Sequence, residues 1–181
     1  QRIEEDLRGL LDGEVHCDPA STALYSTDGS IFQIEPTGVV RPRHIADVMA
    51  CVEYSNHHKI PLHPRGAGSG VSGESLGPGL AIDFSTHFRR IEARDDDTIR
   101  VQPGVVLSTL NSWLANHGRV FGPDPATASV STVGGILGRN SSGSRYRHAL
   151  GERGKPDGRP FNYRWMDGKP NGNNEGRGLF F

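Results

Sequence analysis

The stretch over residues 64–75, PRGAGSGVSGES, constrains the fold more than any other part of the chain. It holds four glycines and three serines, and it lies between the apolar residues 60–62 and the apolar run 80–84. Glycine offers no side chain to pack and is costly to order, so such a segment is typical of a place where main chain approaches another group closely. The sequence therefore predicts a functional loop between two strands, with a flexible surface linker as the alternative.

The spacing within this loop excludes three familiar nucleotide-binding motifs. Residues 68–73 match GxGxxG, but a Rossmann turn requires a helix to begin within the motif, and only six residues separate Gly73 from the next strand. A Walker A loop is excluded because no GK[ST] follows. A kinase loop is excluded because the following strand carries Asp83 where lysine is expected. The remaining interpretation is a strand–loop–strand connection whose successive N–H groups form a concave anion-binding nest.

A second segment rich in small residues follows at 122–144, GPDPATASVSTVGGILGRNSSGS. Loops of this length within a compact domain are usually functional or disordered. Val130, Val133, Ile136 and Leu137 supply apolar anchors that a disordered linker would lack. We therefore expect the two segments to form opposite walls of one slot for a large, flat, phosphate-bearing ligand.

The elements around these segments follow from the spacing of apolar residues. The spacing predicts helices over residues 2–11, 43–58 and 106–117, strands over 37–40, 60–62 and 80–84, and a hairpin over 88–102. The helix at 43–58 is read from Ile45, Val48, Met49 and Val52, while residues 25–35 read as irregular. The order βαβ, hairpin, helix predicts an α+β domain, with a small βαβ part and an antiparallel β part.

The composition of the chain limits the kinds of partner that we expect it to bind. The formal net charge of -1 gives no general electrostatic reason to expect nucleic acid. Cys17 and Cys51 do not have the spacing of a metal site or of a disulfide framework. We also predict no metal site at His57-His58, which ends a helix, or at the acidic residues 95–97, which form a turn. No apolar run reaches the ~20 residues of a membrane span, and the first residues do not resemble a signal peptide. A cytoplasmic location is expected, with peripheral membrane association as an alternative.

Several motifs in a fixed order carry a family resemblance. They are VVRP at 39–42, IPLHPRGAGSGVSG at 60–73, a strand with Asp83, VQPGV at 101–105, GPDP at 122–125 and STVGGILGRNSSG at 131–143. Over about residues 20–148 the chain resembles the FAD-binding domain of the vanillyl-alcohol oxidase and p-cresol methylhydroxylase (VAO/PCMH) superfamily. Within it, the chain is most similar to the D-lactate dehydrogenase and glycolate oxidase D-subunit branch.

The resemblance implies FAD as cofactor and a set of residues that bind it. In the first loop these residues hold the FAD pyrophosphate: Arg65, Gly66, Ala67, Gly68, Ser69, Gly70, Ser72, Gly73, Glu74 and Ser75. In the second segment they run beside the flavin: Pro123, Asp124, Ser131, Thr132, Gly134, Gly135, Asn140, Ser142 and Gly143. Some relatives attach flavin covalently through a histidine in the first loop, but Ser69 stands at that position, which favours non-covalent FAD.

The resemblance further implies a flavin-dependent oxidoreductase acting on a small 2-hydroxy acid such as D-lactate or glycolate, with an unknown electron acceptor. The expected parts are an N-terminal helix in residues 1–19, the FAD-binding domain in 20–150 and a glycine-rich tail in 151–181, disordered or aberrant. Neither the strand that closes the FAD domain in relatives nor a substrate-binding cap is found after Arg145, so we expect a truncated or frameshifted end and can assign no catalytic residue. The alternative is a non-catalytic nucleotide-binding module or an inactive fragment.

Overall fold

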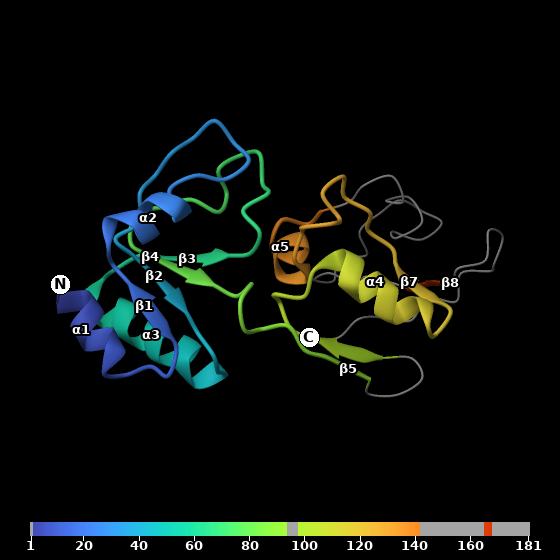
Figure 1. Ribbon diagram of the computed structural model, residues 1–181, viewed down its shortest axis with the longest axis horizontal. Coiled ribbons are helices and arrows are strands. Elements are labelled where there is room, and N and C mark those ends of the chain that lie inside the picture. The colour runs from blue at the N-terminus through green and yellow to red at the C-terminus, as the bar shows by residue number, and fades with distance from the viewer. Residues whose placement is uncertain (1, 94–97, 142–164, 168–181) are drawn as a thin grey trace. The chain divides into compact units, whose positions relative to one another are not determined.

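The structure of the chain, a computed structural model, describes residues 2–93, 98–141 and 165–167 (Figure 1). It divides the chain into two compact units, residues 1–88 and 89–181. The acidic turn predicted at 95–97 and most of the predicted tail lie outside the described residues. Each unit combines helices with strands, which confirms the α+β class.

Unit 1 is built on a four-stranded sheet with the order β1-β2-β4-β3. Strands β2 and β3 run parallel to β4, with Val40 opposite Ile82 and Leu62 opposite Leu80, whereas β1 is antiparallel to β2. The elements in chain order are α1 (Arg2–Arg8), β1 (Glu14–His16), α2 (Pro19–Tyr25), β2 (Gly38–Arg41), α3 (Ile45–His58), β3 (Leu62–Arg65) and β4 (Leu80–Asp83).

The core of unit 1 lies around β4. All four residues of that strand are buried, as expected for a strand with a parallel neighbour on each side. Side chains from α1, β2 and α3 complete the cluster, which includes Leu7, Val40, Cys51 and Tyr54. A fully buried leucine of this kind contributes about 2 kcal/mol, so this cluster accounts for most of the packing that holds the sheet in place.

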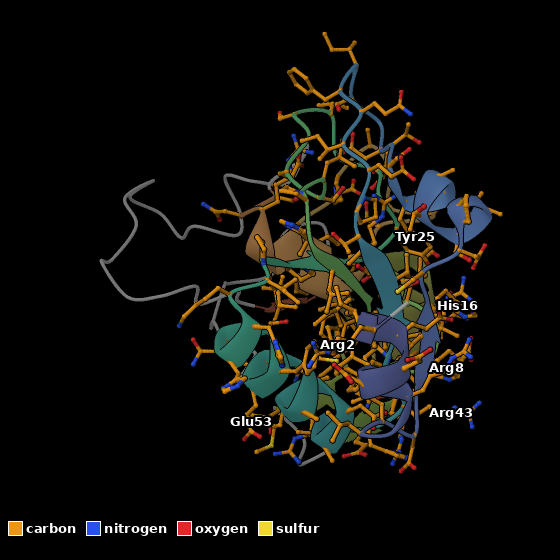
Figure 2. The ribbon with its side chains drawn as sticks, turned by 90° about the vertical axis from the view of Figure 1, so that its left-hand side faces the viewer. Arg2, Arg8, His16, Tyr25, Arg43 and Glu53 are labelled. Carbon is orange, nitrogen blue, oxygen red and sulfur yellow. The ribbon has the colours of Figure 1, made fainter. Side chains whose placement is uncertain are left out.

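The helix predicted at 43–58 is confirmed as α3, but the apolar residues that predicted it do not form its buried face. Ile45, Met49 and Val52 are 69%, 58% and 50% exposed. The buried residues are Asp47, Cys51, Tyr54 and Ser55. In Figure 2, Glu53 lies on the outer side of α3.

Buried Asp47 explains part of this difference. Its carboxylate accepts the main-chain N–H groups of Arg43 (2.7 Å), His44 (3.2 Å) and Asp12 (3.0 Å), so it holds the start of α3 to the turn before β1. Burial alone raises the pKa of Asp47, but these hydrogen bonds outweigh it and hold the pKa below its ordinary value. A polar residue thus faces inward because it satisfies donors that would otherwise be left unpaired.

One predicted strand of unit 1 lies elsewhere, and two short elements of unit 1 were not predicted. The strand predicted at 60–62 lies at Leu62–Arg65, because main-chain pairing with β4 begins at Leu62. The short elements β1 and α2 were not predicted. Helix α2 lacks an apolar stripe, and its first turn is instead capped by Asp18, which accepts the N–H of Ser21 at 3.0 Å.

A charged cluster joins β1 to its neighbours. The Glu14 carboxylate faces Arg41 (3.4 Å), His87 (3.3 Å), His16 (3.5 Å) and Arg43 (3.9 Å). The hydrogen bond with His87 contributes most to the lowered pKa of Glu14. Figure 2 shows His16 and Arg43 on the same side of unit 1.

In its described residues, unit 2 contains two antiparallel strand pairs and two helices. Its elements are β5 (Ile91–Ala93), β6 (Ile99–Val101), α4 (Leu107–Ala115), β7 (Arg119–Phe121), α5 (Val133–Gly138) and β8 (Trp165–Asp167). β5 pairs with β6, and β7 pairs with β8. The predicted hairpin and the predicted helix at 106–117 are confirmed, whereas β7, α5 and β8 were not predicted.

The core of unit 2 forms where α4 meets α5. Leu107, Leu110 and Leu114 of α4 are buried together with Val133 and Ile136 of α5. Trp113 packs against this cluster and stacks on the His117 ring with the centroids 4.3 Å apart. None of the helices in the described part of the chain has the length and apolar character that a bilayer crossing requires.

Candidate cofactor-binding site

The glycine-rich loop is the connection between two adjacent parallel strands. The chain leaves the end of β3 at Arg65 and enters β4 at Leu80, and no helix intervenes, as predicted. Parallel neighbours require a crossover of a dozen residues or so, usually a helix. Here the crossover is made of irregular main chain beyond the ends of the strands (Figure 1), and its residues 66–75 are exposed or half-buried, whereas Leu76, Gly77 and Gly79 are buried.

Three glycines in this loop, Gly68, Gly73 and Gly79 (φ +98°), have backbone angles that other residues rarely adopt. Gly68 has φ +63° and Gly73 has φ +75°, both in the left-handed region. Among the described residues, no protein acceptor takes the N–H groups of Gly66, Ala67 and Gly68. Successive N–H groups of this kind are suited to an anion with several oxygens, such as a diphosphate.

The loop is also crowded where it turns. A Cβ on Gly73 would lie 2.9 Å from the Phe32 ring, and a Cβ on Gly68 would lie 2.6 Å from the guanidinium carbon of Arg65. Within the same loop, the Glu74 carboxylate accepts the N–H of Ser72 at 3.0 Å. Glycine is therefore required by close approach as well as by angle.

A segment that sequence reasoning left as irregular supports the loop. The loop between α2 and β2 lies beside the glycine-rich loop in both views (Figures 1 and 2). The N–H of Gly29 donates to the carbonyl oxygen of Gly68 at 3.0 Å. Arg65 donates to the carbonyl oxygen of Thr27 at 2.8 Å, and its guanidinium lies 5.5 Å from the Tyr25 ring centroid. The only signal in the sequence was the turn-forming triplet Asp28-Gly29-Ser30.

Tyr25 is itself fixed by buried charge. Its hydroxyl donates to Asp83 at 2.5 Å and accepts a hydrogen bond from Arg41 Nε at 3.3 Å. Burial, followed by the hydrogen bond to Asp83, raises the pKa of Tyr25. The ring that faces Arg65 is therefore held by the end of β4.

His63 has a structural role. Its Nε2 hydrogen-bonds the carbonyl oxygen of Pro78, which lies at the far end of the same loop. The side chain also fills the space beside Gly77. His63 thus connects β3 to the part of the crossover loop that precedes β4.

The second segment is built differently. The structure folds part of it into α5, which corrects the prediction of a long loop. The N–H groups of Val133 and Gly134 donate to the carbonyl oxygens of Val105 (2.8 Å) and Pro103 (2.9 Å). Val133 and Ile136 are buried and Leu137 packs against them, but Val130 is 48% exposed and is not an anchor.

Thr132 and Gly134 have structural roles at the start of α5. Thr132 is the N-cap, and its hydroxyl accepts the N–H of Gly135 at 3.3 Å. A Cβ on Gly134 would lie 2.6 Å from Cβ of Pro103, so glycine allows α5 to pack against this turn. Asn140 has φ +54°, consistent with the tight turn predicted there.

The predicted site residues therefore fall in two places. Those from Arg65 to Ser75 lie in the crossover loop of unit 1. Pro123, Asp124, Ser131, Thr132, Gly134, Gly135 and Asn140 lie in unit 2, while Ser142 and Gly143 lie outside the described residues. That the two segments face one slot stays a prediction.

Solved structures show the same fold. Alkyldihydroxyacetonephosphate synthase matches with a TM-score of 0.69 and 21% identity, over 78% of this chain and 32% of that chain. Chitooligosaccharide oxidase matches with a TM-score of 0.65 and 19% identity, over 76% of this chain and 30% of that chain. The fold is thus that of VAO/PCMH-type FAD-binding domains, and the predicted fold class is confirmed.

The family follows from sequence. The model described as "FAD binding domain" matches residues 36–151, and the chain belongs to this family. D-2-hydroxyglutarate dehydrogenase of Escherichia coli strain K12 is 33% identical over 72% of this chain and 13% of its own length. The glycolate oxidase subunit GlcD of Bacillus subtilis strain 168 is 30% identical over 70% of this chain and 28% of its own length. The chain thus spans less than a third of these relatives.

Proposed function

We propose that this chain is the FAD-binding part of a flavin-dependent oxidoreductase that acts on a small 2-hydroxy acid. The FAD-binding family supports the cofactor, and the relatives named as D-2-hydroxyglutarate dehydrogenase, glycolate oxidase subunit and D-lactate dehydrogenase support the substrate class. When bound, FAD supplies the redox chemistry, because no amino-acid side chain accepts a hydride in this way. The part of this chain is to hold and orient the cofactor.

The crossover loop of unit 1 is proposed to hold the FAD diphosphate. The observation that carries this proposal is the group of accessible N–H groups at Gly66, Ala67 and Gly68, together with the left-handed angle at Gly68. Main-chain donors bind phosphate oxygens without the desolvation of a buried lysine or arginine, which agrees with a formal net charge of -1. The segment at 123–143 is proposed to run beside the flavin.

Binding is proposed to be non-covalent. By the family resemblance, Ser69 stands where covalently linked relatives carry histidine, and a serine hydroxyl is a weak nucleophile at its ordinary pKa. The proton-accepting base of the oxidation is not assigned to any residue of this chain. We therefore expect the chain alone to show little turnover even when it carries flavin.

Reconstitution with FAD tests this proposal. The purified chain is incubated with FAD, desalted, and its visible flavin absorbance is measured, with circular dichroism to confirm folding. We expect a retained flavin band that moves entirely to the filtrate when the protein is denatured and filtered. Folded protein that emerges colourless contradicts FAD binding, and flavin that stays with the denatured chain contradicts non-covalent attachment.

A further inference from the structure

The segment over residues 25–30 contacts the crossover loop at three places. Where the loop leaves β3, Arg65 donates to the carbonyl oxygen of Thr27 at 2.8 Å. Ten residues further on, the hydroxyl of Ser75 donates to Oδ2 of Asp28 at 3.0 Å. Between them, the N–H of Gly29 donates to the carbonyl oxygen of Gly68 at 3.0 Å. The part of the loop from Arg65 to Ser75 is thus fastened at three points by one short segment.

Asp28 is the charged centre of this contact. Its other oxygen, Oδ1, accepts the N–H of Ser30 at 2.8 Å, which fixes the carboxylate within its own turn. The Ser75 hydroxyl also accepts a hydrogen bond from Arg65, whose Nη1 lies 3.5 Å away. Partial burial alone raises the pKa of Asp28, but the bonds from Ser30 and Ser75 and the charge of Arg65 outweigh it and lower the pKa. The Asp28 carboxylate is therefore ionised at neutral pH and accepts hydrogen bonds from Ser30 and Ser75.

Close packing leaves little freedom in this arrangement. A Cβ on Gly29 would lie 2.8 Å from the carbonyl oxygen of Gly70 and 3.2 Å from that of Ser69. A glycine-rich loop otherwise loses much conformational entropy when it closes on a ligand.

We propose that Asp28 is a positioning residue, which holds Ser75 directly and Arg65 through Ser75, so that the crossover loop has its binding shape before the cofactor arrives. This inference rests on the proposed function, because it concerns how the same loop holds the FAD diphosphate. Order established in advance lowers the entropic cost of binding and so raises affinity. Asp28 acts through Ser75 and Arg65 and need not contact the cofactor.

Asp28→Asn is the principal test, because it keeps the size of the side chain and removes its charge. Asp18→Asn is the matched control, since Asp18 caps α2 and asparagine caps a helix equally well. Ser75→Ala is a second variant that breaks the same contact from the loop side. FAD affinity is measured by flavin fluorescence titration, and amide hydrogen exchange of residues 66–75 is measured without flavin.

We expect FAD to bind about tenfold more weakly to Asp28→Asn, as for the loss of a charge-assisted hydrogen bond, and Asp18→Asn to bind like the parent. Exchange should rise at residues 66–75 of the flavin-free variant and remain unchanged elsewhere in unit 1. The double variant with Ser75→Ala should bind about as weakly as Asp28→Asn alone, because the two changes break one contact.

Two results overturn the inference while leaving the proposed function intact. One is a parent-like FAD affinity in both Asp28→Asn and Ser75→Ala. The other is faster exchange throughout unit 1 with a lowered Tm, which would make Asp28 a general stabiliser of the fold. A parent chain that binds no FAD is a different result: it rejects the proposed function, and the inference falls with it.

Discussion

The two segments rich in small residues are held in place by opposite means. The crossover loop of unit 1 has no secondary structure and is fastened mainly by side-chain hydrogen bonds to residues 27–28, from Ser75 to Asp28 and from Arg65 to the carbonyl oxygen of Thr27. The segment at 131–138 of unit 2 is fastened by main-chain hydrogen bonds to residues 103–107 and by the buried side chains of α5. Similar composition therefore does not imply similar construction. The first segment leaves the N–H groups of residues 66–68 without a protein acceptor among the described residues, whereas the second uses many of its peptide groups for its own folding.

The largest effect is expected at Gly134, where packing requires glycine. Gly134→Ala should destabilise unit 2 by about 2 kcal/mol, because the new Cβ overlaps Pro103. Gly138→Ala in the same helix is the matched control, since a Cβ there meets nothing within 4 Å. It should leave stability unchanged or raise it by about 0.5 kcal/mol. Chemical denaturation followed by Trp fluorescence measures both, and equal stabilities would contradict the packing role.

The next effect is expected at Gly68, where glycine serves binding. Gly68→Ala and Gly118→Ala carry nearly the same backbone strain, since φ is +63° and +64°, and each should cost about 1 kcal/mol of stability. A Cβ on Gly118 meets nothing, whereas one on Gly68 displaces the Arg65 guanidinium from the loop. FAD titrations should show affinity lowered about tenfold or more for Gly68→Ala and unchanged for Gly118→Ala. Equal affinities would contradict a role of Gly68 in binding.

A smaller effect is expected from the cap of α5. Thr132→Ala should destabilise unit 2 by about 1 kcal/mol, because the N–H of Gly135 loses its side-chain acceptor. Thr132→Ser retains the hydroxyl and should restore most of the loss. Thermal unfolding measures both variants. If alanine and serine give the same Tm, the hydroxyl does not support α5.

The smallest effect is expected from acid. The pKa of Asp28 is lowered in the folded chain, so its contribution to the order of the loop is present above the ordinary Asp pKa of about 4 and is lost as pH falls through the lower folded value. The bonds that hold residues 131–138 to 103–107 are between main-chain groups, which do not titrate. Amide NMR spectra recorded from about pH 5 to about pH 3 should therefore show the loop resonances move before those of α5. Simultaneous movement would indicate global unfolding.

How far the sequence predicts this structure depends on what holds each element. Strand β4 and helix α4 are predictable because apolar burial dominates both, as in Leu80–Asp83 and Leu107–Leu114. The inner face of α3 is not, because Asp47 and Ser55 are buried while Ile45 and Met49 are exposed. Helix α5 contains three glycines and is stabilised by tertiary hydrogen bonds that no local pattern records.

The same distinction applies to the site. The crossover loop is predictable because its glycine spacing leaves no room for a helix. Its supports at Tyr25, Thr27 and Asp28 are not, since they lie about forty residues earlier in a stretch without periodicity and come beside the loop only when β2, β3 and β4 assemble. Sequence reasoning finds the main chain that meets a ligand more readily than the side chains that hold that main chain in place.

Hydrogen exchange with and without FAD tests the central claim most directly, because it reports on both segments in one experiment. The account predicts that saturating FAD slows exchange at residues 66–70 and also at residues 123–135, while α1 and the outer face of α3 remain unchanged. Protection confined to one segment, or absent from both in a chain that retains flavin, would contradict the claim that both hold the same cofactor.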